Sequence, residues 1–128
     1  MSGTIDISAL SAPPEKHEFA AAKFFANLGK NVKFIKPSNI PNIHTPDIFM
    51  DGVEWEIKSP QGQSRRTIEN NLRQALLQSR NVIFDLRRSG VPESEAIAKL
   101  EKEFSSNSKL RKLYIITRDG RLIEKNKN

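Results

Sequence analysis

The chain has 128 residues, a length that suits one domain with its own hydrophobic core. It carries 21 Lys and Arg against 15 Asp and Glu, a net charge of +6 that favours a polyanionic partner. The absence of cysteine excludes disulfides and thiolate zinc sites, and no apolar run or leader predicts a membrane span or a signal peptide.

The first third of the chain predicts one helix, one strand and a long loop. Residues 1–12 have little pattern and are expected to be flexible, whereas residues 13–128 are expected to form one domain. A helix is predicted from Pro13-Pro14 to near Gly29, because apolar residues recur there with helical spacing. A strand over residues 31–35 follows, and the Pro- and Asn-rich stretch to Pro46 predicts a loop.

The remaining elements alternate between strands and helices. Residues 48–57 predict a hairpin around Asp51-Gly52, a strong turn signal. Thr67 is the expected N-cap of a helix that runs to about Ser79, and a strand over residues 81–87 follows. A helix over 92–104 and a hairpin over 110–117 and 121–124 complete the chain. The predicted fold is α+β, in the order α-β-β-β-α-β-α-β-β, with a mostly antiparallel sheet and helices mainly on one face.

The hairpin places two carboxylates and a lysine on one face. With a two-residue turn at Asp51-Gly52, Asp47 lies opposite Glu56, and opposed residues share a face. Lys58 lies two residues beyond Glu56 and therefore joins that face, while Trp55 points into the core. Like charges directly opposite each other normally destabilise a sheet, so this arrangement calls for a chemical explanation.

Three explanations fit this face. The carboxylates can hold Mg²⁺ while Lys58 positions the attacking water. Alternatively, one carboxylate acts as general base on an RNA 2′-hydroxyl and Lys58 stabilises the phosphorane, without a metal. The third explanation is a solvated face with an ordinary ion pair between Glu56 and Lys58.

Neighbouring residues favour a phosphodiester substrate. Residues 57–88 contain seven cations and two anions, which concentrates the positive charge beside the hairpin. Alternation in the strand over 81–87 predicts that Asp85 and Arg87 lie opposite the helices, on the face of Glu56 and Lys58, where Thr117 can join them. The other candidates for substrate binding lie at the start of the second helix and along its polar face: Arg65, Arg66, Asn71 and Gln78.

His17 has two interpretations. It lies on the apolar stripe of the first helix, where a histidine is commonly a half-buried packing residue. A side chain that titrates near neutral pH also suits acid–base chemistry on RNA.

The hairpin and the segments after it carry a resemblance to a known family. The block 45–60, from Thr45-Pro46-Asp47 to Lys58-Ser59-Pro60, together with 64–73, Gln78 and 81–88, resembles the C-terminal toxin domains of contact-dependent growth inhibition, the CdiA type, and related polymorphic toxins. The resemblance covers roughly residues 15–124. It implies a nuclease that cleaves tRNA, which would make residues 13–128 a nuclease domain.

Two parent folds compete within this resemblance. Pro46-Asp47 followed by Glu56-Ile57-Lys58 in an αβββαβ order is similar to PD-(D/E)XK nucleases, which implies that Asp47 and Glu56 bind metal and that Lys58 is catalytic. The second parent is the barnase/EndoU/colicin/RelE-like ribonuclease fold, which works without metal. There the resemblance implies roles for Glu56, Lys58 and Thr67, and for His17 on the N-terminal helix.

The sequence therefore predicts a tRNA endoribonuclease toxin that acts by 2′-hydroxyl attack without a cofactor. Glu56 or His17 would handle protons, and Lys58 would stabilise the transition state, assisted by Arg87. The toxin would be delivered as part of a larger secreted protein, act in the target-cell cytoplasm and be held off by an immunity protein. A Mg²⁺-dependent DNase using Asp47, Glu56 and Lys58 is the first alternative, and a non-catalytic basic nucleic-acid-binding module is the second.

Overall fold

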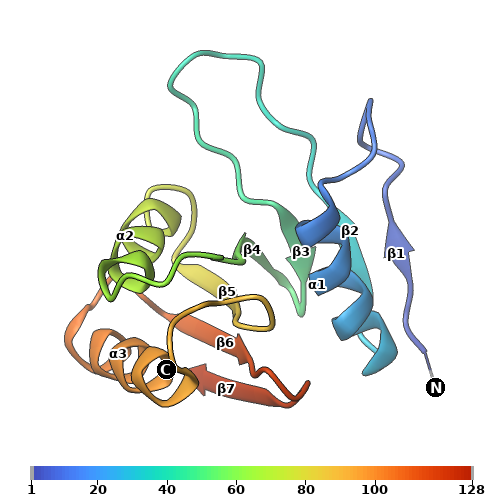
Figure 1. Ribbon diagram of the computed structural model, residues 1–128. Coiled ribbons are helices and arrows are strands. Elements are labelled where there is room, and N and C mark those ends of the chain that lie inside the picture. The colour runs from blue at the N-terminus through green and yellow to red at the C-terminus, as the bar shows by residue number, and fades with distance from the viewer. Residues whose placement is uncertain (1, 128) are drawn as a thin grey trace.

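The computed structural model describes residues 2–127, which form three helices and a seven-stranded sheet (Figure 1). The strands follow chain order across the sheet, from β1 to β7. In order, the elements are β1 (Ile5–Asp6), α1 (Lys16–Asn27), β2 (Val32–Phe34), β3 (Ile48–Met50), β4 (Val53–Lys58), α2 (Arg66–Ala75), β5 (Asn81–Asp85), α3 (Glu93–Ser106), β6 (Lys112–Ile116) and β7 (Leu122–Asn126). None of the helices within this described part is long and apolar enough to cross a membrane.

The α+β class and the predicted order of elements are confirmed, with one strand added. Residues 1–12 were expected to be flexible, yet Ile5 and Asp6 form β1, which pairs in parallel with β2. The sheet is mixed rather than mostly antiparallel, because β4 pairs in parallel with β5, and β5 with β6. Helices α2 and α3 connect these strands as crossovers. Each helix returns the chain to the edge of the sheet where the preceding strand began, so the next strand runs in the same direction.

The helices cover both faces of the sheet. Ile83 of β5 packs in a core cluster with Ala21 and Phe25 of α1. Its neighbours Val82 and Phe84 pack in a second cluster with residues of α2 and α3. Since successive side chains of a strand point to opposite faces, α2 and α3 share one face, as predicted for most of the helices, and α1 covers the other.

The β3–β4 hairpin has the predicted register. Asp51 and Gly52 form the turn with φ of 56° and 82°, the left-handed conformation that a two-residue hairpin requires. Ile48 lies opposite Trp55, as expected. Trp55 is fully buried, and its indole N–H donates to the Met50 carbonyl at 2.8 Å, so its predicted place in the core is confirmed.

Two irregular segments extend beyond α1 at the top of Figure 1. One is the stretch between β1 and α1, and the other is the long loop between β2 and β3. The loop is held by its own hydrogen bonds, from Ser38 N–H to Thr45 Oγ1 at 3.1 Å and from Ile40 N–H to Ser38 Oγ at 3.1 Å. Asn42 adopts a left-handed backbone conformation within the loop, with φ of 66°.

Candidate active site

Three carboxyl groups meet at one end of the β3–β4 hairpin. Asp47 directly precedes β3, Glu56 lies on β4, and Glu18 comes from the first turn of α1. Asp47 stands in the middle, within hydrogen-bonding reach of both other carboxyl groups. Its position is fixed by the Ile57 N–H, which donates to Asp47 Oδ2 at 2.8 Å, and by its own N–H, which donates to the Trp55 carbonyl at 2.9 Å.

Lys58 completes this carboxylate cluster. Glu56 and Lys58 share one face of β4, as predicted. Asp47 lies just before the paired residues of β3, and its N–H bonds to Trp55 rather than following the Ile48–Trp55 register, but its side chain still reaches Glu56. Lys58 Nζ lies 3.5 Å from Glu56 Oε2, and both side chains are largely removed from water. Lys58 therefore offers one positive charge to Glu56, while Asp47 and Glu18 add two further carboxyl groups beside that ion pair.

Burial and mutual repulsion weaken the acidity of all three groups. Burial raises the pKa of Asp47 to about 7, and the neighbouring charge of Glu56 adds to the effect. Burial, followed by the charge of Asp47, also raises the pKa of Glu18 to about 7. The pKa of Glu56 is raised by burial, against the opposing influence of Asp47 and Lys58. Carboxyl groups this close are compatible only while they share a proton or a cation.

One oxygen of the cluster has no partner. Glu56 is 3% exposed, and among residues 2–127 nothing donates a hydrogen bond to its buried Oε1. An unpaired buried carboxylate oxygen is costly, and a bound cation would remove that cost. Mg²⁺ commonly binds one or two carboxylates and keeps waters in its other positions. The donor set of Asp47 and Glu56, with Glu18 beside it, fits such a cation.

A second acidic group adjoins the cluster through Glu18. Ligand atoms of Glu15, His17 and Glu18 lie within 4.8 Å of one another. His17 Nδ1 lies 3.4 Å from Glu15 Oε2, and the imidazole is half-buried, at the end of the stripe formed by Ala21 and Phe25. His17 therefore flanks the cluster from α1, and it lies beside Glu15 rather than Lys58 or Glu56.

The expected place of Asp85 and Arg87 is wrong. In the parallel register, Glu56 pairs with Val82 and Lys58 with Phe84, so Asp85 shares the opposite face with Ile83 and α1. Asp85 is buried there and forms an ion pair with Arg87 at 2.8 Å. Arg87 also donates to the Ala20 carbonyl of α1 at 3.1 Å. The ion pair of Asp85 and Arg87 therefore links the end of β5 to α1.

Thr117 forms its hydrogen bonds within a turn. It follows β6, and its side chain is hydrogen-bonded to Asp119 and accepts from the Arg121 N–H at 2.9 Å. These contacts belong to the turn between β6 and β7. The hydrogen bonds of Thr117 do not reach Glu56 or Lys58, so its expected juxtaposition with them stays a prediction.

The predicted residues around α2 occupy different places. Thr67 was expected as the N-cap, but α2 begins at Arg66, and Arg65 occupies the capping position without a side-chain bond. Thr67 is instead packed against Gly62, where an added Cβ would meet its hydroxyl at 2.6 Å. Asn71 donates to the Thr67 carbonyl at 2.8 Å, which uses its amide within the helix.

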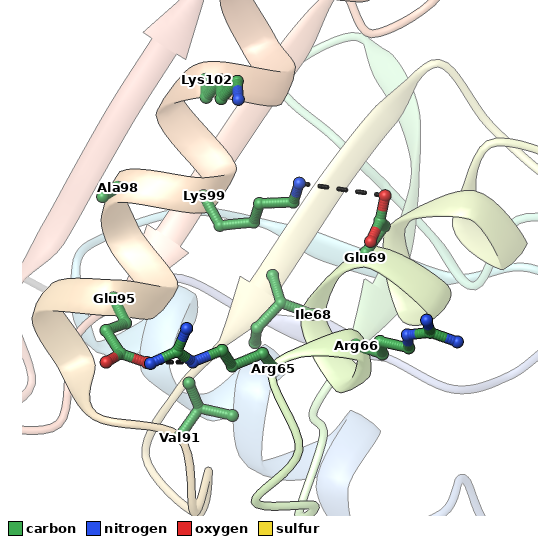
Figure 2. A pocket seen from close by; sticks show the side chains of 9 residues that line it. All are labelled: Arg65, Arg66, Ile68, Glu69, Val91, Glu95, Ala98, Lys99 and Lys102. Carbon is green, nitrogen blue, oxygen red and sulfur yellow. Dashed lines mark ion pairs between the residues drawn. The ribbon is translucent and has the colours of Figure 1, made fainter.

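Arg65 and Arg66 line a separate pocket of 470 Å³ between α2 and α3 (Figure 2). Arg65 lies 3.8 Å from Glu95, and Lys99 lies 3.8 Å from Glu69 across the same pocket. Figure 2 shows Arg66 pointing away from these ion pairs. This pocket does not include any member of the carboxylate cluster.

Among the residues predicted around α2, Gln78 lies near the carboxylate cluster. It belongs to the turn after α2 and lines a cleft of 420 Å³ together with Glu18 and Asp47. Glu18 itself was missed by the sequence reasoning, which chose its neighbour His17. No local spacing links Glu18 to Asp47, because the contact forms only when α1 packs on the sheet.

Comparison with known proteins identifies the family. Residues 44–122 match the family described as "Contact-dependent growth inhibition CdiA C-terminal domain", while a search of curated proteins finds no match. One similar solved structure is the "CdiA-CT/CdiI toxin and immunity complex from Burkholderia pseudomallei". It is 18% identical, with a TM-score of 0.73, over 98% of this chain and 100% of that one. The chain belongs to the CdiA C-terminal domain family and has the fold of a toxin of contact-dependent growth inhibition.

Proposed function

We propose that this toxin domain is a nuclease that cleaves tRNA, with a divalent cation held by Asp47 and Glu56. The observation that carries the proposal is the buried, unpartnered oxygen of Glu56 beside a second carboxyl group and a lysine. The αβββαβ order and the parallel β4–β5 pairing also fit the metal-dependent parent fold better than an antiparallel ribonuclease sheet. The tRNA substrate comes from the resemblance to growth-inhibition toxins.

Each residue of the cluster has a separate task. When bound, the cation would supply Lewis-acid stabilisation of charge on a phosphate oxygen. Lys58, fixed beside Glu56, donates to a phosphate oxygen or orients the attacking water. Glu18 holds Asp47 in place and, with a pKa near 7, can give or take a proton at neutral pH.

The metal-free mechanism requires that Glu56 reach the substrate directly. As a general base on a 2′-hydroxyl, Glu56 would need an oxygen open to substrate, yet it is 3% exposed. Coordination suits a buried oxygen better, because a cation can lie between the carboxylate and the substrate. The buried oxygen of Glu56 therefore favours the Mg²⁺-dependent mechanism, which the sequence offers only as an alternative.

Cleavage assays separate these mechanisms. Purified protein is incubated with total tRNA and with plasmid DNA, in Mg²⁺ and in EDTA. Cleavage of tRNA that requires Mg²⁺ supports the proposal, cleavage that persists in EDTA supports the metal-free mechanism, and cleavage of DNA alone supports the DNase. Intact tRNA and DNA under all conditions would leave only a binding module.

Matched variants show whether the cluster is responsible. Glu56→Gln should abolish cleavage, while Glu54→Gln, an exposed carboxylate on the same strand, should not affect it. Lys58→Ala is compared with Lys33→Ala, an exposed lysine of β2. Loss of one charged donor typically costs about 10²–10³-fold in rate.

The partners follow from the same family. The similar structure contains an immunity protein, and we propose that this domain also binds one in the cell that produces it. As a CdiA C-terminal domain it is delivered as part of a larger secreted protein. Its place of action, in this proposal, is the cytoplasm of the target cell, where tRNA is available. Co-expression with the immunity protein should restore growth that the toxin alone arrests.

A further inference from the structure

The 420 Å³ cleft beside the carboxylate cluster has two irregular walls. One wall comes from residues 10–15, between β1 and α1, and the other from residues 37–38 and 43–46 of the β2–β3 loop. Both segments extend beyond α1 in Figure 1. Glu18 and Asp47 belong to the lining, so whatever enters this cleft meets the carboxylate cluster.

The lining of the cleft suits a base and a sugar rather than a phosphate, because it carries the carboxyl groups of Glu15, Glu18 and Asp47. No lysine or arginine is among the described residues that line the cleft. The lining also has four prolines (Pro13, Pro14, Pro37 and Pro46), whose rings offer apolar surface. Hydroxyl and amide groups, such as those of Ser11 and Gln78, stand among them and can bind the edge of a base.

The size and depth of the cleft exclude a regular duplex. A volume of 420 Å³ falls in the range of about 300–1,000 Å³ that encloses small ligands, which is the size class of one nucleotide. Glu18 and Asp47 line the cleft and are only partly exposed, so a scissile phosphate must reach into the cleft to approach the carboxylate cluster. In a duplex the bases are stacked inside the helix, and a base enters such a cleft only when it is unpaired.

We propose that this cleft binds the base and sugar of one unpaired nucleotide next to the scissile phosphate, so that the substrate is an RNA loop or single-stranded end. The inference rests on the proposed nuclease function and narrows its substrate class. The β2–β3 wall is preformed by the bonds between Ser38, Thr45 and Ile40, which reduces the entropy lost on binding.

The proposal is tested by binding, independently of cleavage. Fluorescein-labelled RNA probes of one length are titrated with the Lys58→Ala protein in EDTA, and their anisotropy is recorded. One probe is fully paired, one has an unpaired loop and one is single-stranded. We expect the probes with unpaired nucleotides to bind about tenfold tighter, the scale of one stacked base. Equal affinity for the paired probe would overturn the proposal.

Substitutions that fill the cleft add a second readout. Ala12 and Ser11 are exposed wall residues, so Ala12→Trp and Ser11→Trp, made in the Lys58→Ala background, should fill the space without disturbing the core. Ala98→Trp, in the pocket between α2 and α3, is the matched control. We expect either wall variant to remove the preference for unpaired RNA and the control to keep it. A preference that survives in both folded wall variants would contradict the proposal.

The two proposals fail in distinguishable ways. If the wild-type protein cleaves paired and unpaired RNA equally in Mg²⁺, the nuclease stands and the unpaired-nucleotide cleft is refuted. If the binding preference and its loss in Ala12→Trp are observed but no RNA is cleaved, the cleft stands and the nuclease is refuted.

Discussion

Asp47→Asn should change how the stability of the protein depends on pH. The raised pKa of Asp47 means that the folded state keeps a proton that the unfolded chain releases between about pH 4 and 7. The free energy of unfolding therefore falls as pH rises through this window, and the penalty is complete above pH 7. Asparagine cannot ionise, yet its side-chain oxygen can still accept from the Ile57 N–H. The Asp47→Asn variant should therefore not lose stability through ionisation of residue 47 as pH rises, and its local structure should be kept.

The size of the effect follows from the shift. From 3.8 to about 7 is roughly three pKa units, a ceiling of about 4 kcal/mol at about 1.36 kcal/mol per unit. Asp47 keeps some contact with water and shares its proton with Glu56, so an effect of about 2 kcal/mol is expected.

Urea unfolding at about pH 5 and pH 8 measures this difference. Between these values the wild-type protein should lose about 2 kcal/mol more than Asp47→Asn. Glu54→Gln, which removes an exposed carboxylate of β4, should behave like the wild type. If Asp47→Asn shows the same dependence on pH as the wild type, the coupling within the carboxylate cluster is refuted.

Three further predictions follow from the fold and the cluster. Mg²⁺ at about ten times its Kd should stabilise the wild type by roughly 1.4 kcal/mol at pH 8 and leave the melting temperature of Glu56→Gln unchanged. An equal rise in the melting temperature of both proteins would show that the cation binds elsewhere. Arg87→Ala should lower the free energy of unfolding by about 3 kcal/mol, because it leaves Asp85 buried without its ion pair. The protein that remains folded should cleave at the wild-type rate. A cleavage defect larger than the loss of folded protein would show that Arg87 contributes to the active site. Phe25→Ala should cost about 3–5 kcal/mol in urea unfolding, since Phe25 is fully buried between α1 and the sheet, and a smaller loss would argue against that packing.

The hairpin was predictable because its determinants are local. Asp51-Gly52 fixes a two-residue turn, and the two-residue period of a strand then places Glu56 and Lys58 on one face, with Asp47 near Glu56 at the end of the hairpin. No knowledge of the rest of the chain is needed for this result. The same holds for the buried position of Trp55.

The parts that failed depend on tertiary contacts. Alternation showed that Asp85 and Val82 lie on opposite faces, but which face carries Glu56 depends on the register of β4 with β5, a pairing between segments far apart in the chain. The role of Glu18 depends on how α1 docks, and Thr67, expected as the N-cap, lies inside α2 and against Gly62. Strand direction likewise follows the crossover helices rather than any strand's own residues.

The cleavage of tRNA with Mg²⁺ and with EDTA, in the wild type, Glu56→Gln and Glu54→Gln, tests the central claim most directly. The account predicts cleavage by the wild type and Glu54→Gln in Mg²⁺, restored when Mg²⁺ is added back in excess after EDTA. Glu56→Gln should leave tRNA intact under every condition. Cleavage in EDTA, or by Glu56→Gln at the wild-type rate, would contradict a cation site at the carboxylate cluster.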